Sequence, residues 1–228
     1  MTMEVYMTNR TILNADPHAL AETLIKVLEA SAEEMNVLLA TQQLLLSGHP
    51  AAPAQIAARL RMSQDAVVAL LRQIGVEWDA AGNVVGAGVS LTPTPHSYIV
   101  GGRQLYVWCA GDAITFPILH KTSAVIESPD PINGAKIHLI GTPEGAKEVQ
   151  PSTAVVSWMP GTESLNNIRA NFCNLTNFFA SVETATQYVA QHPGLLMSPV
   201  DAVFQAGKLL WERQPFTSLL AGLEQRQG

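Results

Sequence analysis

The stretch that decides the fold class is residues 103–117, which read RQLYVWCAGDAITFP. Its first half is rich in aromatic and branched residues and predicts a strand over 103–109 that ends at Cys109. Asp112 follows three residues later, at the point where a helix over 110–116 is expected to begin. Strand and helix segments continue after this stretch, and their order predicts an α+β architecture.

Further strands are expected in a region that begins after Pro93 and Pro95. The Gly101–Gly102 pair and the turn sequence at 130–134 each join two of these strands, as tight turns do in antiparallel hairpins. The sequence therefore predicts a mixed, mainly antiparallel sheet with flanking helices. The expected strands are 97–100, 103–109, 123–128, 136–141, 152–158 and 174–180, and the expected helices are 110–116, 162–170, 184–191 and 199–213.

The first 92 residues have a different, mainly helical pattern. Asp16 before Pro17 is typical of a helix start, and the pair Ser31 and Glu34 indicates a second one. Two shorter helices follow, of which Ser63 caps the second and Gly75 stops it, and residues 76–91 are typical of a hairpin. Three helices and a hairpin form the winged-helix pattern. We therefore expect residues 1–92 to be a helical winged-helix-like module that packs on an α+β domain at 93–228.

Composition narrows the class of protein. The chain has 228 residues and a formal charge of −6, with 47% hydrophobic and 14% charged residues, which excludes wholesale disorder and argues against a polyanion as partner. No apolar run reaches the ~18 residues of a membrane span, and residues 1–14 have no signal-peptide pattern. The two cysteines, Cys109 and Cys173, cannot staple a domain of this size, so we expect free thiols and a cytoplasmic protein.

Cys109 is the first candidate for a reactive group. At a strand-to-helix junction, free backbone N–H groups and the helix dipole lower the pKa of a thiol, and a carboxylate within one turn can accept or donate a proton. Cys173 lies in the stretch NFCNLTNFF at 171–179. If the two sulfurs share one apolar cleft, they would select a soft metal ion; no CxxC motif or histidine set indicates a closed zinc site. The alternative is that both cysteines are core residues, with Asp112 as a helix cap.

Other classes of site have little support. The sequence has no GxGxxG after a strand, no GxxxxGK[ST] and no GxSxG motif. The expected recognition helix sets Arg72 against Asp65, and the wing has no basic residue, so a winged helix used for packing is favoured over one that binds DNA. His120 is expected to cap a helix or to lie at the surface. Tyr106 and Trp108 could line a pocket, although strand alternation would place Trp108 opposite Cys109.

The stretch 103–117 resembles the signature R-x-L-Y-x-W-C-A-x-D-x-x-x-F-P of the organomercurial (alkylmercury) lyases. Downstream, Phe172-Cys173 followed by FFAS at 178–181 resembles the second cysteine motif of that family. The resemblance covers roughly residues 20–215 and implies a winged-helix-like module packed on a family-specific mixed sheet, with the catalytic domain at 93–228.

The resemblance also implies an enzyme that cleaves carbon–mercury bonds by protonolysis, giving Hg(II) and a hydrocarbon in mercury resistance and detoxification. Cys109 and Cys173 would be the catalytic thiols, Asp112 would be the catalytic residue that handles the proton, and all three would form the metal site. No organic cofactor is implied, and Hg(II) would be the bound product. The partners would be an organomercurial substrate, low-molecular-weight thiols needed for turnover, and mercuric reductase as acceptor of Hg(II). Neither nucleic acid nor membrane is expected.

The chain departs from some members of that family, which carry a further cysteine directly after the second catalytic one and histidines just beyond. These positions hold Asn174, Leu175 and Asn177. The differences bear on substrate preference and on the release of Hg(II), while the minimum set of two thiols and one carboxylate is intact. Two other hypotheses stay open: a non-catalytic soft-metal-binding or redox-responsive winged-helix regulator, and a relative that holds Hg(II) or copper without breaking a bond.

Overall fold

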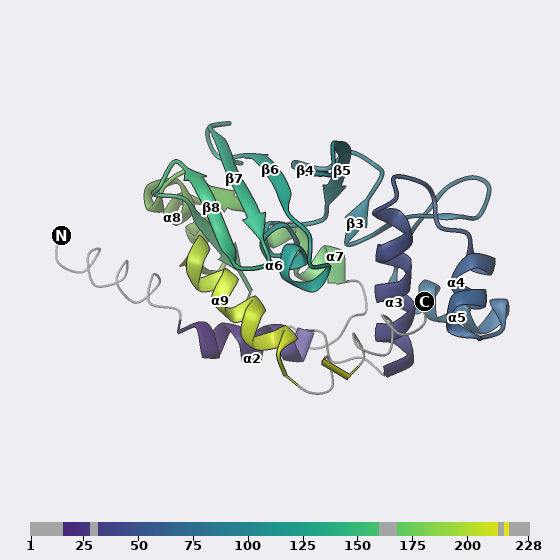
Figure 1. Ribbon diagram of the computed structural model, residues 1–228. Coiled ribbons are helices and arrows are strands. Elements are labelled where there is room, and N and C mark those ends of the chain that lie inside the picture. The colour runs from purple at the N-terminus through teal and green to yellow at the C-terminus, as the bar shows by residue number, and fades with distance from the viewer. Residues whose placement is uncertain (1–15, 28–31, 160–167, 214–216, 219–228) are drawn as a thin grey trace.

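A computed structural model of the protein describes residues 16–27, 32–159, 168–213 and 217–218. Three helices, α3 (Ala32–Leu45), α4 (Pro53–Leu60) and α5 (Gln64–Ile74), gather at one end of the molecule (Figure 1). The main sheet extends toward the other end, where α2 (Pro17–Val27) and α9 (Val200–Trp211) pack against each other below it (Figure 1). The expectations for residues 1–14, for the helix start at Ser31 and for most of the helix at 162–170 fall outside the described residues.

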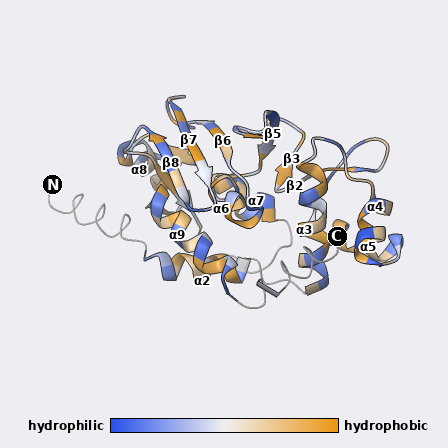
Figure 2. Ribbon diagram, in the orientation of Figure 1, coloured by the Kyte–Doolittle hydropathy of each residue, from blue (hydrophilic) through white to orange (hydrophobic). Residues whose placement is uncertain are grey.

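The helix boundaries follow local signals in the sequence. Asp16 accepts the backbone N–H of His18 at 3.0 Å and Ser63 accepts that of Ala66 at 3.2 Å, so side chains satisfy free N–H groups at both helix starts. Gly75 ends α5 in the left-handed conformation with φ of 79°, which glycine adopts without strain. These predictions are confirmed. Hydrophilic and hydrophobic residues alternate around α4 and α5, whose apolar sides are buried (Figure 2). None of the described helices is long and apolar enough to cross a membrane.

The main sheet has eight strands, and every neighbouring pair is antiparallel. The sheet continues across residue 92, because Val89 pairs with Val107 on the next strand of the ladder. The hairpins predicted at 101–102 and 130–134 are both present. In spatial order the strands are β1 (Glu77–Trp78), β2 (Val84–Ala87), β3 (Val89–Ser90), β5 (Arg103–Val107), β4 (His96–Val100), β6 (Ala124–Pro129), β7 (Lys136–Thr142) and β8 (Gly145–Gln150).

A smaller antiparallel sheet has the order β10 (Phe178–Phe179), β9 (Val155–Trp158) and β11 (Leu196–Pro199), and α8 (Val182–Gln191) packs against it. The single strand predicted at 174–180 is wrong in its first half. Residues there form the short helix η1 (Cys173–Leu175), which follows α7 (Ile168–Asn171). Thr176 stabilises this turn, since its N–H donates to the Cys173 carbonyl at 3.1 Å and its hydroxyl to that of Phe172 at 3.0 Å.

Strands β8 and β11 lack the alternation that would have predicted them. β8 is a half-buried edge strand of sequence GAKEVQ, in which the core-packing Ala146 and Val149 are not at alternate positions. β11 is only four residues long, LMSP, and was not predicted; the helix expected at 199–213 included only its last residue, Pro199. The rest of the fold agrees with a mixed α and β protein built on an antiparallel sheet.

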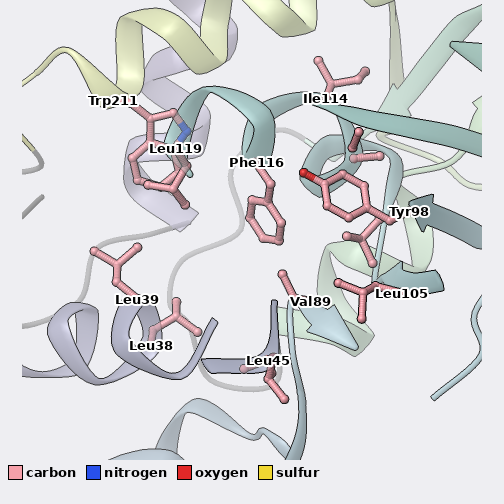
Figure 3. Close-up of a cluster of buried hydrophobic side chains, with 14 of the residues drawn as sticks. Leu38, Leu39, Leu45, Val89, Tyr98, Leu105, Ile114, Phe116, Leu119 and Trp211 are labelled. Atoms are coloured by element: carbon pink, nitrogen blue, oxygen red, sulfur yellow. The ribbon is translucent and has the colours of Figure 1, made fainter. Parts of the chain in front are cut away.

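The helix α6 (Ala110–Leu119) lies at the centre of the core. Phe116 projects from it between the α3 leucines, Leu38 and Leu39, and Tyr98 of the sheet (Figure 3). The helix was expected to end at residue 116, but it contains Pro117 and continues to Leu119. Helix α9 packs on its other side. The residue that begins this central helix is therefore fixed by packing on several sides.

Candidate functional site

Three side chains that are distant in the sequence meet at the start of α6. The sulfurs of Cys109 and Cys173 and a carboxylate oxygen of Asp112 all lie within 4.8 Å of one another. Both cysteines are buried and neither is in a disulfide. Among the described residues, this is the one group of three or more potential metal-ligating side chains that could hold an ion. Two soft sulfur donors with one carboxylate suit a thiophilic metal ion.

Cys109 is itself the N-cap of α6. Its backbone is extended, with φ of −152° and ψ of 170°, and its sulfur accepts the backbone N–H of Asp112 at 3.3 Å. The interpretation of Asp112 as the helix cap is therefore wrong. Asp112 instead lies in the first turn of α6, three residues after Cys109. Its carboxylate is there within 4.8 Å of both sulfurs. The strand-to-helix junction thus provides the first sulfur and the carboxylate together.

Cys173 comes from a separate segment that is tied to the same junction. The N–H of Ala110, the first residue of α6, donates to the carbonyl of Thr176 at 3.0 Å. Ser157 of β9 donates its hydroxyl to the Leu175 carbonyl at 2.6 Å. These contacts hold η1 between α6 and the smaller sheet, so that Cys173 faces Cys109.

The protonation of the site differs from the expectation. Burial raises the pKa of the Cys109 thiol well above its ordinary value, against the N–H bond from Asp112 that favours thiolate. A hydrogen bond from Cys109 lowers the pKa of Cys173, but burial and the Asp112 charge outweigh it, and this pKa is raised as well. The predicted low thiol pKa at the helix start is wrong, because desolvation exceeds the effect of the helix terminus. In the free protein both sulfurs are thiols at neutral pH.

The carboxyl of Asp112 is placed to exchange protons at neutral pH. Burial raises its pKa from 3.8 to about 7, although hydrogen bonds from Cys109 favour the charged form. Its Oδ2 atom is buried and has no hydrogen-bond partner among the described residues. A carboxyl with these properties can both accept and donate a proton near pH 7.

An apolar pocket surrounds the three groups. It encloses about 80 Å³ of free volume, and Leu24 of α2 contributes to its wall. The main polar side chains that line it besides the three site residues are Gln42 and Thr115; the Thr115 hydroxyl is satisfied by the Gly111 carbonyl at 2.9 Å. The other aliphatic and aromatic lining residues are Met35, Leu38, Leu39, Ile74, Ala87, Trp108, Phe116, Leu119, Ile168, Phe172, Leu210 and Trp211.

Trp108 lies on the same side as Cys109, contrary to the expectation from strand alternation. Strand β5 ends at Val107, so the two-residue repeat no longer applies, and the backbone N–H of Trp108 donates to the Gly88 carbonyl at 2.9 Å. Its ring packs with Phe172 and the two cysteines, and the guanidinium of Arg169 lies over it at 5.3 Å from the ring centre. Arg169 was missed, although a basic residue four positions before Cys173 was the signal that could have identified it.

The structure places the remaining candidate residues outside the pocket. His120 caps the C-terminal end of α6, which confirms the first of its two expected roles: its backbone N–H donates to the Phe116 carbonyl at 2.8 Å, its ring lies edge-on against that of Phe116, and burial lowers its pKa to about 4. Tyr106 does not line the pocket. Asn174, Leu175 and Asn177 do not line it either; the Asn177 amide donates to the Asn174 carbonyl at 3.1 Å and its N–H to Ser157 at 3.1 Å. These residues stabilise the η1 segment.

Comparisons with known proteins agree on one family. The family model described as MerB, alkylmercury lyase, matches residues 89–212. An alkylmercury lyase from Bacillus cereus is 44% identical over 138 residues, which are 60% of this chain and 63% of that protein, so the match spans slightly less than two thirds of this relative. One from Staphylococcus epidermidis is 38% identical over 172 residues, 75% of this chain and 79% of that protein. One from Pseudomonas putida is 35% identical over 167 residues, 73% and 78% of the two chains.

A solved structure shows a similar fold. The crystal structure of the mercury-bound form of MerB2 superposes with a TM-score of 0.72 and covers 90% of this chain and 98% of that one, at 20% sequence identity. At this level of identity the likeness extends to the architecture alone.

Proposed function

Because the chain belongs to the alkylmercury lyase family, we propose that it cleaves the carbon–mercury bond of alkyl- and arylmercury compounds by protonolysis and releases a hydrocarbon and Hg(II). The observation that carries the proposal is the convergence of Cys109, Asp112 and Cys173 within 4.8 Å at the wall of an apolar pocket. We assign the two cysteines as thiol ligands of mercury and Asp112 as the residue that transfers the proton.

The reaction is a balanced exchange of bonds. The two thiols exchange their S–H bonds for Hg–S bonds, the Hg–C bond breaks, and a C–H bond forms with one of the two thiol protons. The other proton leaves with the anion first bound to mercury. Mercury stays in the +2 state throughout, so no oxidant or reductant is consumed. Asp112, with its pKa of about 7, takes the proton from a thiol and passes it to the leaving carbon.

The surroundings favour each part of this exchange. A carbon–mercury bond is weakly polar and resists protonation in water, but donation from two sulfurs moves electron density toward carbon. The apolar wall accepts the organic group and excludes water, which strengthens the electrostatic interactions inside. Metal binding deprotonates a coordinating thiol, so the raised thiol pKa values of the free protein do not prevent capture.

The direct test supplies the reduced protein with phenylmercury or methylmercury and excess thiol, and measures benzene or methane in the headspace. Cys109→Ser, Cys173→Ser and Asp112→Ala should each abolish release without unfolding the chain. Wild-type turnover in Cys173→Ser would reject a two-thiol mechanism. Stoichiometric retention of Hg(II) with no hydrocarbon would instead indicate a non-catalytic metal-binding protein.

The same chemistry suggests the partners. Two Hg–S bonds have to be exchanged before the next turnover, so we assign low-molecular-weight thiols as co-reactants and mercuric reductase as the acceptor of Hg(II). A compartment that keeps thiols reduced, the cytoplasm, suits two free cysteines. The residues assigned here carry every step without an organic cofactor.

We also propose that residues 1–92 are a winged-helix-like module and that 93–228 are the catalytic domain. Helices α3, α4 and α5 followed by β1, β2 and β3 support this division. In this proposal the module helps to build the pocket and does not bind DNA. Leu24 and Leu38 line the pocket, while α5 carries one basic residue, Arg72, and one acidic residue, Asp65, and so has no net positive charge with which to bind phosphates. Salt-dependent binding to duplex DNA would contradict this assignment and favour the regulator hypothesis.

A further inference from the structure

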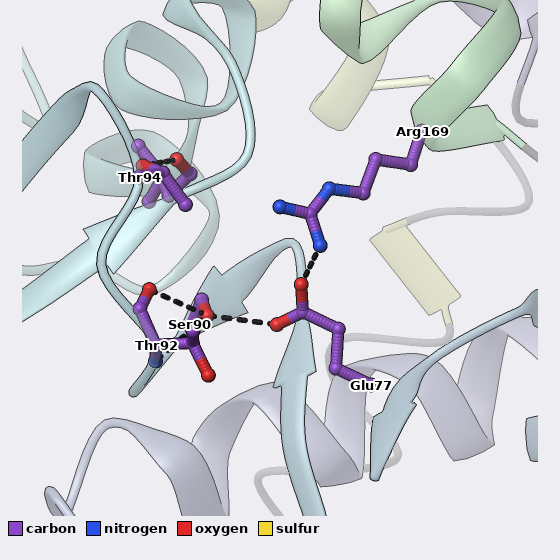
Figure 4. A network of polar contacts seen from close by, with 6 residues as sticks. Glu77, Ser90, Thr92, Thr94 and Arg169 are labelled. Carbon is purple, nitrogen blue, oxygen red and sulfur yellow. Dashed lines mark hydrogen bonds and ion pairs between the residues drawn. The ribbon is translucent and has the colours of Figure 1, made fainter.

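We propose that Glu77 is a positioning residue for the second cysteine and acts through Arg169. The proposal rests on the proposed function, because a reaction that needs two sulfurs on one mercury atom depends on how firmly those sulfurs are held together. Neither residue touches the reacting atoms. They lie on segments far apart in the sequence and face each other in an ion pair (Figure 4).

Arg169 is held between two groups. Its Nη1 forms an ion pair with Oε1 of Glu77, and its guanidinium lies over the Trp108 ring at 5.3 Å from the ring centre. The side chains of Arg169 and Glu77 are 36% and 21% exposed, so the pair is partly shielded from water. A guanidinium over an indole face is attracted by the negative charge of the ring. The ion pair and the stacking therefore both restrain the same side chain.

The carboxylate of Glu77 also has a partner other than Arg169. Its Oε2 accepts the hydroxyl of Ser90 at 2.9 Å (Figure 4). Glu77 lies opposite Gly86 in the β1–β2 ladder, and a Cβ at Gly86 would occupy the space of the Glu77 carboxylate. The strand pair therefore needs glycine at this position to let the carboxylate lie across it. Contacts within β1, β2 and β3 therefore orient Glu77 in addition to its ion pair with Arg169 of α7.

Arg169 and the Trp108 ring that it covers are each close in sequence to one of the two site cysteines. Arg169 belongs to α7, which is followed directly by Phe172 and Cys173, and Trp108 precedes Cys109. Trp108, Phe172 and the two cysteines form one packed cluster. The ion pair thus joins β1, which carries Glu77, to the α7–η1 segment, which carries Cys173. Without it, α7 loses a restraint, and the separation of the two sulfurs becomes more variable.

The test uses a probe that needs both sulfurs but no transfer of a proton to carbon. Phenylarsine oxide bonds two thiols to one As(III) and releases water, so its affinity reports how well the sulfurs are paired. Glu77→Gln and Arg169→Gln should each weaken its binding about three- to tenfold, the range expected for a partly shielded ion pair and a cation–π contact. The kcat for phenylmercury should fall by a similar factor, and KM should change less.

Two comparisons make the result specific. Glu127→Gln removes the Glu127–Lys136 ion pair of 2.7 Å, far along the sheet on β6 and β7, and should leave arsenical binding and kcat unchanged. The double variant Glu77→Gln/Arg169→Gln should be no weaker than Arg169→Gln alone, because the two residues act as one unit.

Three outcomes would overturn the proposal. These are wild-type arsenical affinity in Glu77→Gln, losses that add fully in the double variant, and an equal loss in Glu127→Gln. If the wild-type protein released no hydrocarbon, the proposed function would fail, while the arsenical measurement would still decide whether Glu77 positions the sulfurs.

Discussion

Replacing Asp112 by asparagine should stabilise the protein at alkaline pH while removing its activity. The folded chain favours the neutral carboxyl, because burial raises the pKa from 3.8 to about 7. The stability that this preference gives is complete below about pH 4 and is lost as the pH rises through 7. Asparagine is neutral at every pH, so the free energy of unfolding of the variant should not fall in this way as the pH rises. The variant also lacks the group that we assign to proton transfer.

The size of the effect follows from the two pKa values. Each tenfold change in proton affinity corresponds to about 1.4 kcal/mol, so a rise from 3.8 to about 7 costs the ionised folded state about 4 kcal/mol. Between pH 4 and pH 8 the free energy of unfolding of the wild type should therefore fall relative to that of Asp112→Asn by up to about 4 kcal/mol. Most of the change should occur between pH 4 and 7.

Urea unfolding of both proteins under reducing conditions, at one-unit intervals from pH 4 to pH 8, measures this difference. Asp201→Asn is a matched control, since it removes an exposed carboxylate from the first turn of α9. A constant difference in unfolding free energy between the wild type and Asp112→Asn across this range would refute the reasoning, because Asp112 would then titrate alike in the folded and unfolded chains.

Three further expectations follow from the same geometry. Cys173→Ser should retain the circular-dichroism spectrum but lose benzene release from phenylmercury, measured by headspace gas chromatography. The kcat/KM of the wild type should rise with pH through about 7, because Asp112 has to be ionised to take the thiol proton, and a flat profile from pH 5 to 8 would contradict this. Gly207→Ala should destabilise the fold by about 1–3 kcal/mol in urea unfolding, since its Cβ would lie 2.5 Å from Thr115 Cγ2 where α9 crosses α6.

The parts of the fold that sequence predicted correctly are those set by short-range signals. Ser63 and Gly75 bound α5 because a hydroxyl cap and a left-handed glycine act within one helical turn. The hairpins at 101–102 and 130–134 likewise depend on a few turn residues. The edge strand β8 was missed because its two core-packing residues, Ala146 and Val149, are three positions apart and so do not show the two-residue alternation by which a strand is recognised.

The candidate site was predictable in its residues but not in its electrostatics. The motifs around Cys109 and Cys173 identified the side chains, while only the fold could bring them within 4.8 Å. The helix start beside Cys109 suggested a thiolate, but the degree of burial is a property of the packed structure and reverses that result. Glu77 had no sequence signal at all, because its role depends on a contact with α7 across the molecule.

The burial that reverses the thiol prediction also gives the site its proton supply. With both thiols protonated in the free protein, the proton that has to reach carbon is already next to the position of the metal. Metal capture lowers the thiol pKa, so the proton becomes available only when a mercury–sulfur bond forms. In the mechanism that we propose, Asp112, with a pKa near 7, accepts this proton at little cost and returns it to a more basic carbon. A site with preformed thiolates would bind mercury as well, but only the protonated fraction of Asp112 would then hold a proton inside the apolar pocket.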